Sequence, residues 1–307
     1  MIPKQAGLVP AMQRPLIPFP SARRAFRAFL RKAMSAGEGH VLLPAHIGWS
    51  PREGSGVFDP VEELELPSAF YGLDARLRID VEHFEEQLRR FSPRVVVLIH
   101  YFGYVDPAYL QVVDLAREHG ALVLEDEAHA MLSDLIGGAC GRLGDASLFS
   151  LHKMLPVDDG GALVVNQRGR ELCDGIEAEA SIPALNDFDL YTLAMRRRKN
   201  AQRLEQLLTP MVDRIEVLRP LGPEEVPQTL PVLVHGTSRD QLYEEMNAAG
   251  FGVVSLYHTL VKAVRPDEFP RVHELSSRIM NLPVHEEANE AELERMVEAL
   301  DRFTSKD

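Results

Sequence analysis

Short aliphatic runs alternate with helical segments along the first half of the chain, and this alternation constrains the fold more than any other feature. Arg94 to Ile99 and Ala121 to Leu124 are continuous, strand-length apolar runs. Between them, Pro107 to His119 has the spacing of an amphipathic helix and is followed by Gly120, a residue at which helices commonly end. Apolar strands joined by helices indicate a parallel sheet covered on both faces. We therefore expect an α/β fold.

Other segments extend this pattern. A helix is expected from Ser21 to Met34, because apolar residues recur there at helical spacing. His40 to Leu43 and Ala162 to Val165 are expected to be strands, and the Pro- and Gly-rich stretch Pro44 to Gly56 is expected to be a loop.

The chain changes character after Asn166. A long charged helix is expected from Leu190 to Leu208. With 307 residues the chain exceeds the size at which single cores stop growing, so two unequal domains are expected, residues 1–189 and 190–307. The second is expected to be a smaller α+β domain with strands at Thr229 to His235 and Gly252 to Leu256 and helices at Arg239 to Ala249 and Ala291 to Phe303.

Charge and composition exclude several classes of partner. The formal net charge is -13, so a general surface for nucleic acid or anionic membrane is not expected. The two cysteines, Cys140 and Cys173, form neither a disulfide framework nor a zinc quartet. Met1 to Pro20 lacks the apolar stretch of a signal peptide, and the aliphatic run Val95 to Ile99 is too short to span a bilayer. A cytoplasmic protein is expected.

The segment Glu125-Asp-Glu-Ala-His129 contains the spelling Asp-Glu-Ala-His, which in one class of helicases binds magnesium. Those enzymes also need a Gly-x-x-x-x-Gly-Lys-Ser/Thr loop to hold the phosphates, and the sequence has none. It also lacks the Gly-x-Gly-x-x-Gly, His-Glu-x-x-His and Gly-x-Ser-x-Gly motifs. A nucleotide hydrolase, a dinucleotide enzyme and the common hydrolases are therefore disfavoured.

Two residues remain as candidates for chemistry. Asp126 stands at the end of a predicted strand, where open α/β sheets place their ligand sites, although it could simply cap the next loop. Lys153 stands in the segment Gly144-Asp-Ala-Ser-Leu-Phe-Ser-Leu-His-Lys153, where it follows a strand-like run, and it precedes Gly160-Gly161. Partial burial there would shift its amine toward the neutral, nucleophilic form, although most lysines are merely exposed.

In combination, these features resemble the DegT/DnrJ/StrS family of sugar aminotransferases, a branch of the aspartate-aminotransferase-like (fold type I) enzymes that use pyridoxal 5'-phosphate (PLP). The resemblance extends over most of the chain, through Phe19-Pro-Ser-Ala-Arg23, His40 to His46, Ile99-His-Tyr-Phe-Gly103, Glu125 to Ala130, Gly144 to Gly161 and Met280 to His285. It implies a large PLP-binding domain with a mainly parallel sheet between helices, a smaller C-terminal domain, and a homodimer.

The resemblance assigns a role to each matching residue. Lys153 matches the lysine that carries PLP as a Schiff base, and Asp126 matches the acid that contacts the pyridine nitrogen. His129 matches a position that lies against the ring or its hydroxyl, although a histidine here could instead pair with Asp126. The remaining matches concern the phosphate, which Ser150 and the turn Ser21-Ala22-Arg23 at the start of the first helix would contact. His100 and Tyr101 match a loop that could face the substrate or be purely structural.

Some positions depart from the family pattern. Ala22 and Arg23 replace its usual Gly and Thr, although an arginine could bind phosphate. The family's Asn-x-Arg segment, which reaches the neighbouring subunit's phosphate, is not recognisable near Asp187 to Arg198. The family implies a small-molecule amino donor such as glutamate and a keto acceptor, first of all a nucleotide-linked sugar. The alternatives are a dehydratase-like PLP enzyme, which Lys153 disfavours because those relatives carry histidine there, and a non-catalytic protein of this fold.

Overall fold

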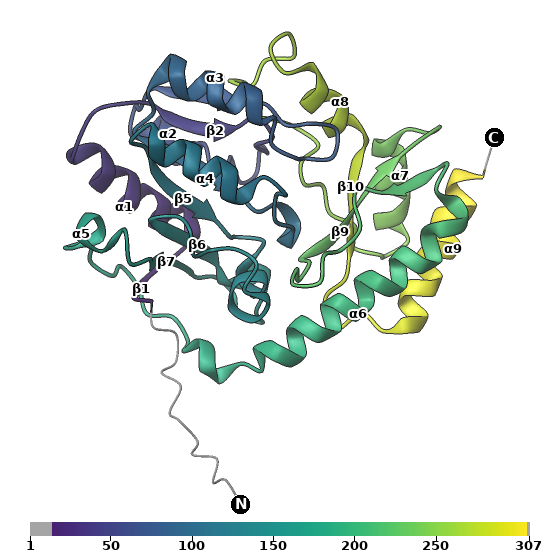
Figure 1. The fold of residues 1–307 in the computed structure, drawn as a ribbon. Coiled ribbons are helices and arrows are strands. Elements are labelled where there is room, and N and C mark those ends of the chain that lie inside the picture. The colour runs from purple at the N-terminus through teal and green to yellow at the C-terminus, as the bar shows by residue number, and fades with distance from the viewer. Residues whose placement is uncertain (1–13, 306–307) are drawn as a thin grey trace, which may run out of the picture.

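The computed structural model describes residues 14–305 and contains one large and one small β-sheet (Figure 1). Residues 1–13, which are part of the segment Met1 to Pro20 considered above for a signal peptide, lie outside the described residues. The large sheet has the strand order β1 (Leu16–Phe19), β7 (Gly161–Val165), β6 (Ala146–Ser150), β5 (Leu122–Asp126), β4 (Val95–Ile99), β2 (Val41–Pro44) and β3 (Ser68–Tyr71).

The five strands from β6 to β3 are parallel to their neighbours, and β7 and β1 continue the sheet by antiparallel pairing. In β4 and β5 the paired residues include Val96 with Val123 and Val97 with Leu124, all fully buried. Strands buried on both faces need apolar residues at every position, which is why these runs have no polar alternation. The predicted α/β class with a mainly parallel sheet is confirmed.

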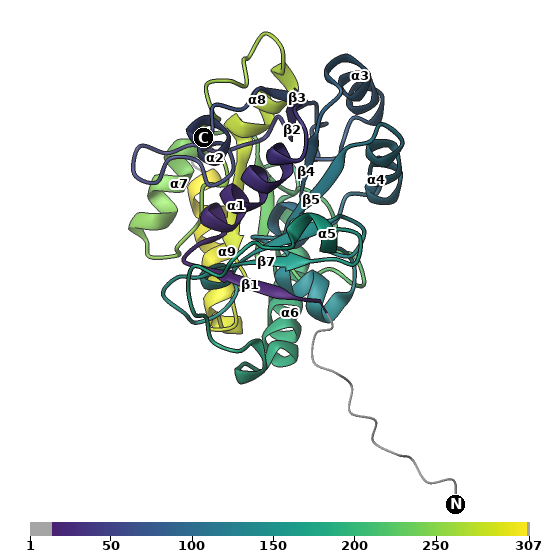
Figure 2. The same cartoon turned by 90° about the vertical axis from the view of Figure 1, so that its left-hand side faces the viewer.

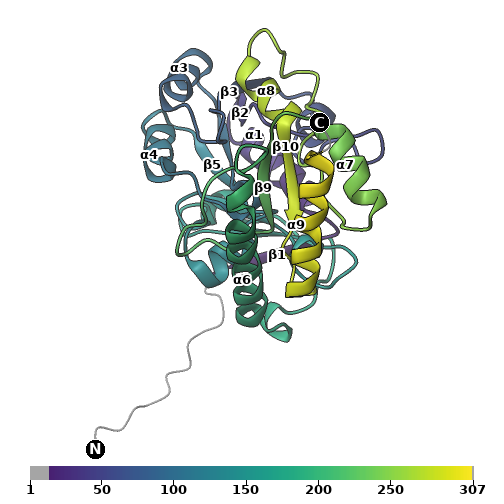
Figure 3. The same cartoon turned by 90° about the vertical axis from the view of Figure 1, so that its right-hand side faces the viewer.

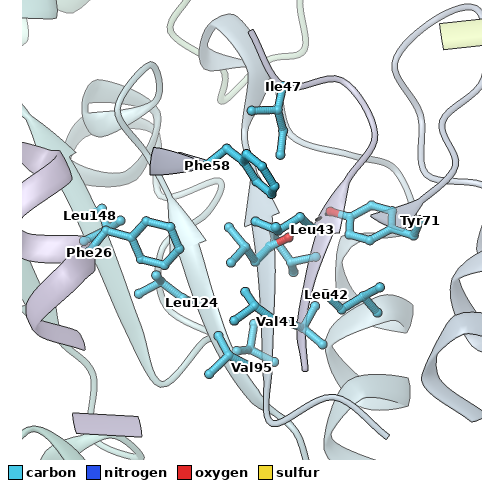
Figure 4. Close-up of a cluster of buried hydrophobic side chains, with 14 of the residues drawn as sticks. Phe26, Val41, Leu42, Leu43, Ile47, Phe58, Tyr71, Val95, Leu124 and Leu148 are labelled. Carbon is cyan, nitrogen blue, oxygen red and sulfur yellow. Dashed lines mark hydrogen bonds between the residues drawn. The ribbon is translucent and has the colours of Figure 1, made fainter. Parts of the chain in front are cut away.

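Helices cover both faces of the large sheet. Helix α1 (Ala22–Ser35) packs against β6 and β7, whereas α3 (Val81–Phe91) and α4 (Tyr109–Glu118) pack against β3 and β5 on the other face (Figure 2). Two short helices, α2 (Asp59–Glu63) and α5 (Arg170–Cys173), pack beside α1. The core between these layers includes Phe26, Leu43, Phe58, Leu124 and Leu148 (Figure 4).

The C-terminal part is built around the small sheet, in the order β10 (Ile279–Pro283), β9 (Thr229–Val234) and β8 (Ile215–Val217), with antiparallel pairing. Three helices lie together beside it, α6 (Leu190–Leu208), α7 (Arg239–Ala248) and α9 (Glu290–Thr304) (Figure 3). Their apolar side chains form a second core with those of β9 and β10. Helix α6 begins after Asp189, whose carboxylate accepts the Thr192 amide.

Two features of this part differ from the sequence expectations. The strand predicted at Gly252 to Leu256 is wrong, since Val254 makes only an isolated bridge to Asn281 and is 36% exposed. In addition, the segment from Leu260 to Ile279, including α8 (Pro270–Arg278), contributes to the core of the large sheet. The division of the chain into residues 1–189 and 190–307 therefore stays a prediction. No helix within residues 14–305 is long and apolar enough to cross a bilayer.

Candidate active site

The candidate site lies where three parallel strands end. Asp126 is the last residue of β5, Ser150 is the last residue of β6, and His100 follows β4. Parallel strands bring their carboxyl ends to one edge of the sheet, which is where open α/β folds bind ligands. Lys153 follows Ser150 in a single turn of 3-10 helix, so the chain turns back over the same edge. The topology thus brings together the acid and the lysine that the sequence singles out.

Asp126 is buried at this edge, and the Oδ1 atom of its carboxylate accepts the Ala128 amide at 2.9 Å. Burial raises the pKa of this carboxyl, whereas the Ala128 amide and the charges of Lys153 and His100 act to lower it. A further positive charge beside Asp126 would therefore stabilise its ionised form.

Lys153 and His129 are in direct contact. The Lys153 Nζ atom lies 3.1 Å from Nε2 of His129. Burial lowers the pKa of Lys153, although the negative charges of Asp126 and Glu53 oppose that change. Burial and the neighbouring lysine also lower the pKa of His129, so its imidazole is neutral at physiological pH.

The hydrogen bonds of His129 fix where its proton lies. The backbone N–H of Phe102 donates to His129 Nδ1 at 3.4 Å, and the Phe102 ring stacks on the imidazole with centroids 5.7 Å apart. A neutral imidazole carries one proton, and with Nδ1 accepting, that proton is on Nε2. Nε2–H then points at Lys153 and favours its neutral amine, whereas the charges of Asp126 and Glu53 favour the protonated form. His129 is thus bonded to Lys153 and not to Asp126.

The start of helix α1 lies next to Ser150. In the register of β1, β7 and β6, Gly161 pairs with Phe19 on one side and with Ser150 on the other. A Cβ atom on Gly161 would lie 2.1 Å from the carbonyl carbon of Ser21 and 2.2 Å from the Ala22 nitrogen, so this close approach requires glycine. The first amides of a helix have no intrahelical acceptor and favour anions.

Ser21 caps this helix, since its hydroxyl accepts the Arg24 amide at 3.4 Å, and the predicted helix start is confirmed. The side chain of Arg23 is directed elsewhere. Its guanidinium lies 3.0 Å from the Asp59 carboxylate and donates to the backbone carbonyl of Glu53. The part of Ser21-Ala22-Arg23 that remains available for an anion is therefore its backbone.

The acids beside Asp126 have structural contacts. Glu125 accepts hydrogen bonds from His100 at 2.8 Å and Tyr109 at 2.6 Å, and also from backbone amides of the loop after Cys140. Glu127 is fully buried, and burial raises its pKa. Residues 14–305 contain no group of three or more His, Cys, Asp or Glu side chains arranged to hold a metal ion. This use of the acids gives no support to a magnesium site.

The residues of the Ile99–Gly103 segment also make structural contacts. His100 is bound to Glu125, as described, and the buried Tyr101 hydroxyl donates to the backbone carbonyl of His46 at 2.7 Å. Neither Phe102 nor Glu53 was predicted to be a site residue from the sequence. Phe102 lies in a quoted family segment and could have been found, whereas Glu53 lies in an irregular segment without a local signal.

These residues fit the PLP group that the sequence resemblance implies. An amine whose pKa is lowered by burial can bind an aldehyde, a buried carboxylate suits a protonated ring nitrogen, and a helix start beside a serine suits a phosphate. The three features lie at the same sheet edge because strands β5, β6 and β7 are adjacent.

The chain matches the model of the DegT/DnrJ/EryC1/StrS aminotransferase family over residues 32–173 and 175–301. It is 24% identical over 251 residues to GDP-perosamine synthase of Caulobacter vibrioides, a match that covers 68% of this chain and 66% of that protein. It is 35% identical over 82 residues to dTDP-4-dehydro-2,3,6-trideoxy-D-glucose 4-aminotransferase of Saccharopolyspora spinosa, covering 25% and 21% of the two chains. The matched parts thus span less than two thirds of these relatives.

Solved structures agree with the fold. A Streptococcus pneumoniae protein described as a sugar aminotransferase, in its PLP form, aligns with a TM-score of 0.79 at 17% identity, covering 96% of this chain and 88% of that one. A DegT/DnrJ/EryC1/StrS aminotransferase of Brucella abortus aligns with a TM-score of 0.74 at 19% identity, covering 95% and 86%. The predicted fold type I architecture is therefore confirmed. Because the family model matches most of the sequence, this chain belongs to the DegT/DnrJ/EryC1/StrS aminotransferase family.

Proposed function

We propose that this protein is a PLP-dependent aminotransferase that moves an amino group from a donor such as glutamate to a keto group. The observation that carries the proposal is the Lys153 amine, held 3.1 Å from a neutral His129 at the sheet edge that also bears Asp126. Membership of an aminotransferase family supports the same reaction class. A dehydratase-like or non-catalytic role has no comparable structural support, because the lysine is present and in contact with its partner.

Each residue has a distinct part in this proposal. When bound, PLP supplies an electron sink for breaking a bond at the substrate's α-carbon. Lys153 links the cofactor covalently and, once released, takes up and returns the substrate proton at Nζ. Asp126 keeps the pyridine nitrogen protonated, and His129 orients the lysine and lies against the ring or its hydroxyl. Ser150 and the amides of Ala22 and Arg23, with Ser21 as the cap, hold the phosphate.

The proposed acceptor is a keto sugar, first of all one linked to a nucleotide. The names of the two relatives support it, since one is a GDP-perosamine synthase and the other acts on a dTDP-linked keto sugar. The net charge of -13 makes general binding of nucleic acid or anionic membrane unfavourable, and we propose a cytoplasmic location.

We also propose a homodimer. Helix α6 exposes Tyr191 and Met195, apolar residues one turn apart that a second subunit would cover. Among the neighbouring cations, Arg197 pairs with Glu286 at 2.9 Å and Arg198 donates to backbone carbonyls of its own chain. Arg196 is exposed and remains the candidate for a contact across the interface. Light scattering that shows an active monomer would contradict the dimer.

Absorption spectroscopy tests the proposed function directly. Purified protein with added PLP should absorb in the visible range, and glutamate should change that spectrum as the amino group is transferred. Reduction with borohydride and peptide mapping should then place the pyridoxyl group on Lys153. A label found only on another lysine, or a spectrum that no amino donor changes, would contradict the proposal. The second outcome would favour the non-catalytic alternative.

A further inference from the structure

Two segments that are distant in the sequence pair at the edge of the candidate site. One is the loop after β2, around Gly48, and the other comes from the C-terminal part of the chain, around Leu260. The Trp49 amide donates to the Thr259 carbonyl at 3.0 Å, and the Val261 amide donates to the Ile47 carbonyl at 2.9 Å. This pairing fixes the position of Tyr257, which lies immediately before the paired residues.

The ring of Tyr257 occupies the place of a side chain at position 48. A Cβ atom on Gly48 would lie 1.9 Å from Cδ1 of Tyr257 and 2.4 Å from its Cγ, distances that real atoms do not show. The φ angle of Gly48 is not positive, so the backbone itself would accept other residues. Glycine is needed at position 48 because the tyrosine ring fills the space.

The surroundings of this ring belong to the candidate site. Its centroid lies 6.4 Å from that of His129 and 5.4 Å from that of His46. Burial raises the pKa of the Tyr257 hydroxyl, and the negative charge of Asp126 raises it further. Tyr257 thus lies beside the histidine that contacts Lys153, and the charge of the acid assigned to the ring nitrogen acts on its hydroxyl.

His46 adds an independent observation at the same place. It is fully buried, and the backbone carbonyl of Leu256, the residue before Tyr257, interacts with its ring. Burial lowers the pKa of His46 to about 3, so the ring is neutral. The ring contact with Tyr257 and the interaction with the Leu256 carbonyl therefore both join His46 to the segment that carries the tyrosine.

We propose that Tyr257 is a cofactor-contacting residue whose ring forms an aromatic wall against the PLP ring, with His46 behind it. The wall comes from the C-terminal part of the chain, whereas Asp126 ends a strand of the large sheet and His129 and Lys153 lie in the segments that follow β5 and β6. The inference rests on the proposed PLP site and adds that cofactor binding draws on both parts of the molecule. An aromatic ring holds another ring by burial and by offset stacking, which aliphatic side chains cannot provide.

The test is the affinity of the cofactor-free protein for PLP, measured by titration of visible absorbance and circular dichroism without turnover. Tyr257→Phe keeps the ring and should bind as wild type does. Tyr257→Leu keeps apolar volume without the ring and should weaken binding roughly tenfold. Gly48→Ala should weaken it comparably, because its methyl group displaces the ring. The control Tyr243→Leu removes a ring of the C-terminal part that meets His258 edge-to-face and should change nothing.

Two outcomes would overturn the inference. If Tyr257→Leu binds PLP as tightly as Tyr257→Phe and gives the same dichroism, the ring does not contact the cofactor. If it binds more tightly, the ring obstructs the site instead of forming its wall. Unchanged far-ultraviolet circular dichroism of Tyr257→Leu and Tyr257→Phe would show that both variants are folded. A wild-type protein that binds no PLP would instead contradict the proposed function, so the two failures are distinguishable.

Discussion

The proton on His129 has a measurable consequence for Lys153. Because the Phe102 amide donates to Nδ1, His129 donates from Nε2 and selects the neutral amine of Lys153. Replacing His129 with alanine removes this donor and admits water, and both changes favour the protonated lysine. The amine of the cofactor-free protein should then be less reactive at neutral pH, before any catalysis is considered.

The expected size of the effect follows from the single hydrogen bond lost. A hydrogen bond contributes about 1 kcal/mol net, and 1.36 kcal/mol corresponds to a tenfold change in a protonation equilibrium. Below the pKa of Lys153, the neutral fraction should therefore fall roughly fivefold in His129→Ala. The sign is definite, because the lost bond stabilises only the neutral form. Burial still lowers the pKa in the variant, so Lys153 should remain more reactive than an exposed lysine.

Competitive acetylation with isotopically labelled anhydride, followed by mass spectrometry, measures this fraction for each lysine across pH. In the wild-type protein, Lys153 should react at lower pH than the exposed Lys199, which serves as an internal reference. His119→Ala replaces an exposed histidine of the C-cap of α4 and is the matched control. Equal reactivity of Lys153 in His129→Ala and in wild type would refute the assignment of the proton to Nε2.

Three further predictions concern the cofactor and the sheet edge. Asp126→Asn should slow the half-reaction with the amino donor on the order of a hundredfold or more, because each 1.4 kcal/mol of lost transition-state stabilisation lowers the rate about tenfold. A stopped-flow rate within about threefold of wild type would exclude the pyridinium contact. Lys153→Ala should bind PLP without covalent attachment and without turnover, as dialysis and activity assays would show. Gly161→Ala should lower the free energy of unfolding by about 1–3 kcal/mol in thermal unfolding, because the added Cβ atom meets the Ser21–Ala22 peptide. The control Gly56→Ala should change it little, because no atom lies within 4 Å of a Cβ atom added there.

Continuous apolar runs made most of the large sheet predictable. Val95–Ile99 is buried almost throughout, and its unbroken run of apolar residues is the pattern expected of such a strand. The segment from Gly252 to Leu256 has similar residues but lacks a continuous partner strand, and pairing is a tertiary property that local composition does not contain. The strand Ile279–Pro283 was not predicted, because its Asn and Pro weaken the strand pattern, and the sequence offered only the family motif Met280 to His285 in this region.

In the candidate site, too, contacts made by tertiary structure could not be predicted from the local sequence. Asp126 and Lys153 could be selected from the sequence because each follows a strand, and parallel strands share an edge. The bond between Lys153 and His129 depends on side-chain direction, which spacing does not specify. The ring of Tyr257 could not be placed from the sequence, because the only local sign of it is a glycine at position 48 in a stretch where glycine also suits a loop.

The C-terminal residues that complete the core of the large sheet affect how the chain folds during synthesis. Leu260, Val261 and Val264 are buried in that core, together with residues of α8. When β7 has left the ribosome, the sheet can begin to pair, but the apolar surface that these residues cover is still open to water. The first half therefore cannot reach its native packing while the second half is being translated. A nascent chain with an uncovered apolar face is a substrate for chaperones and prone to aggregation, so release of the finished polypeptide precedes the last step of folding.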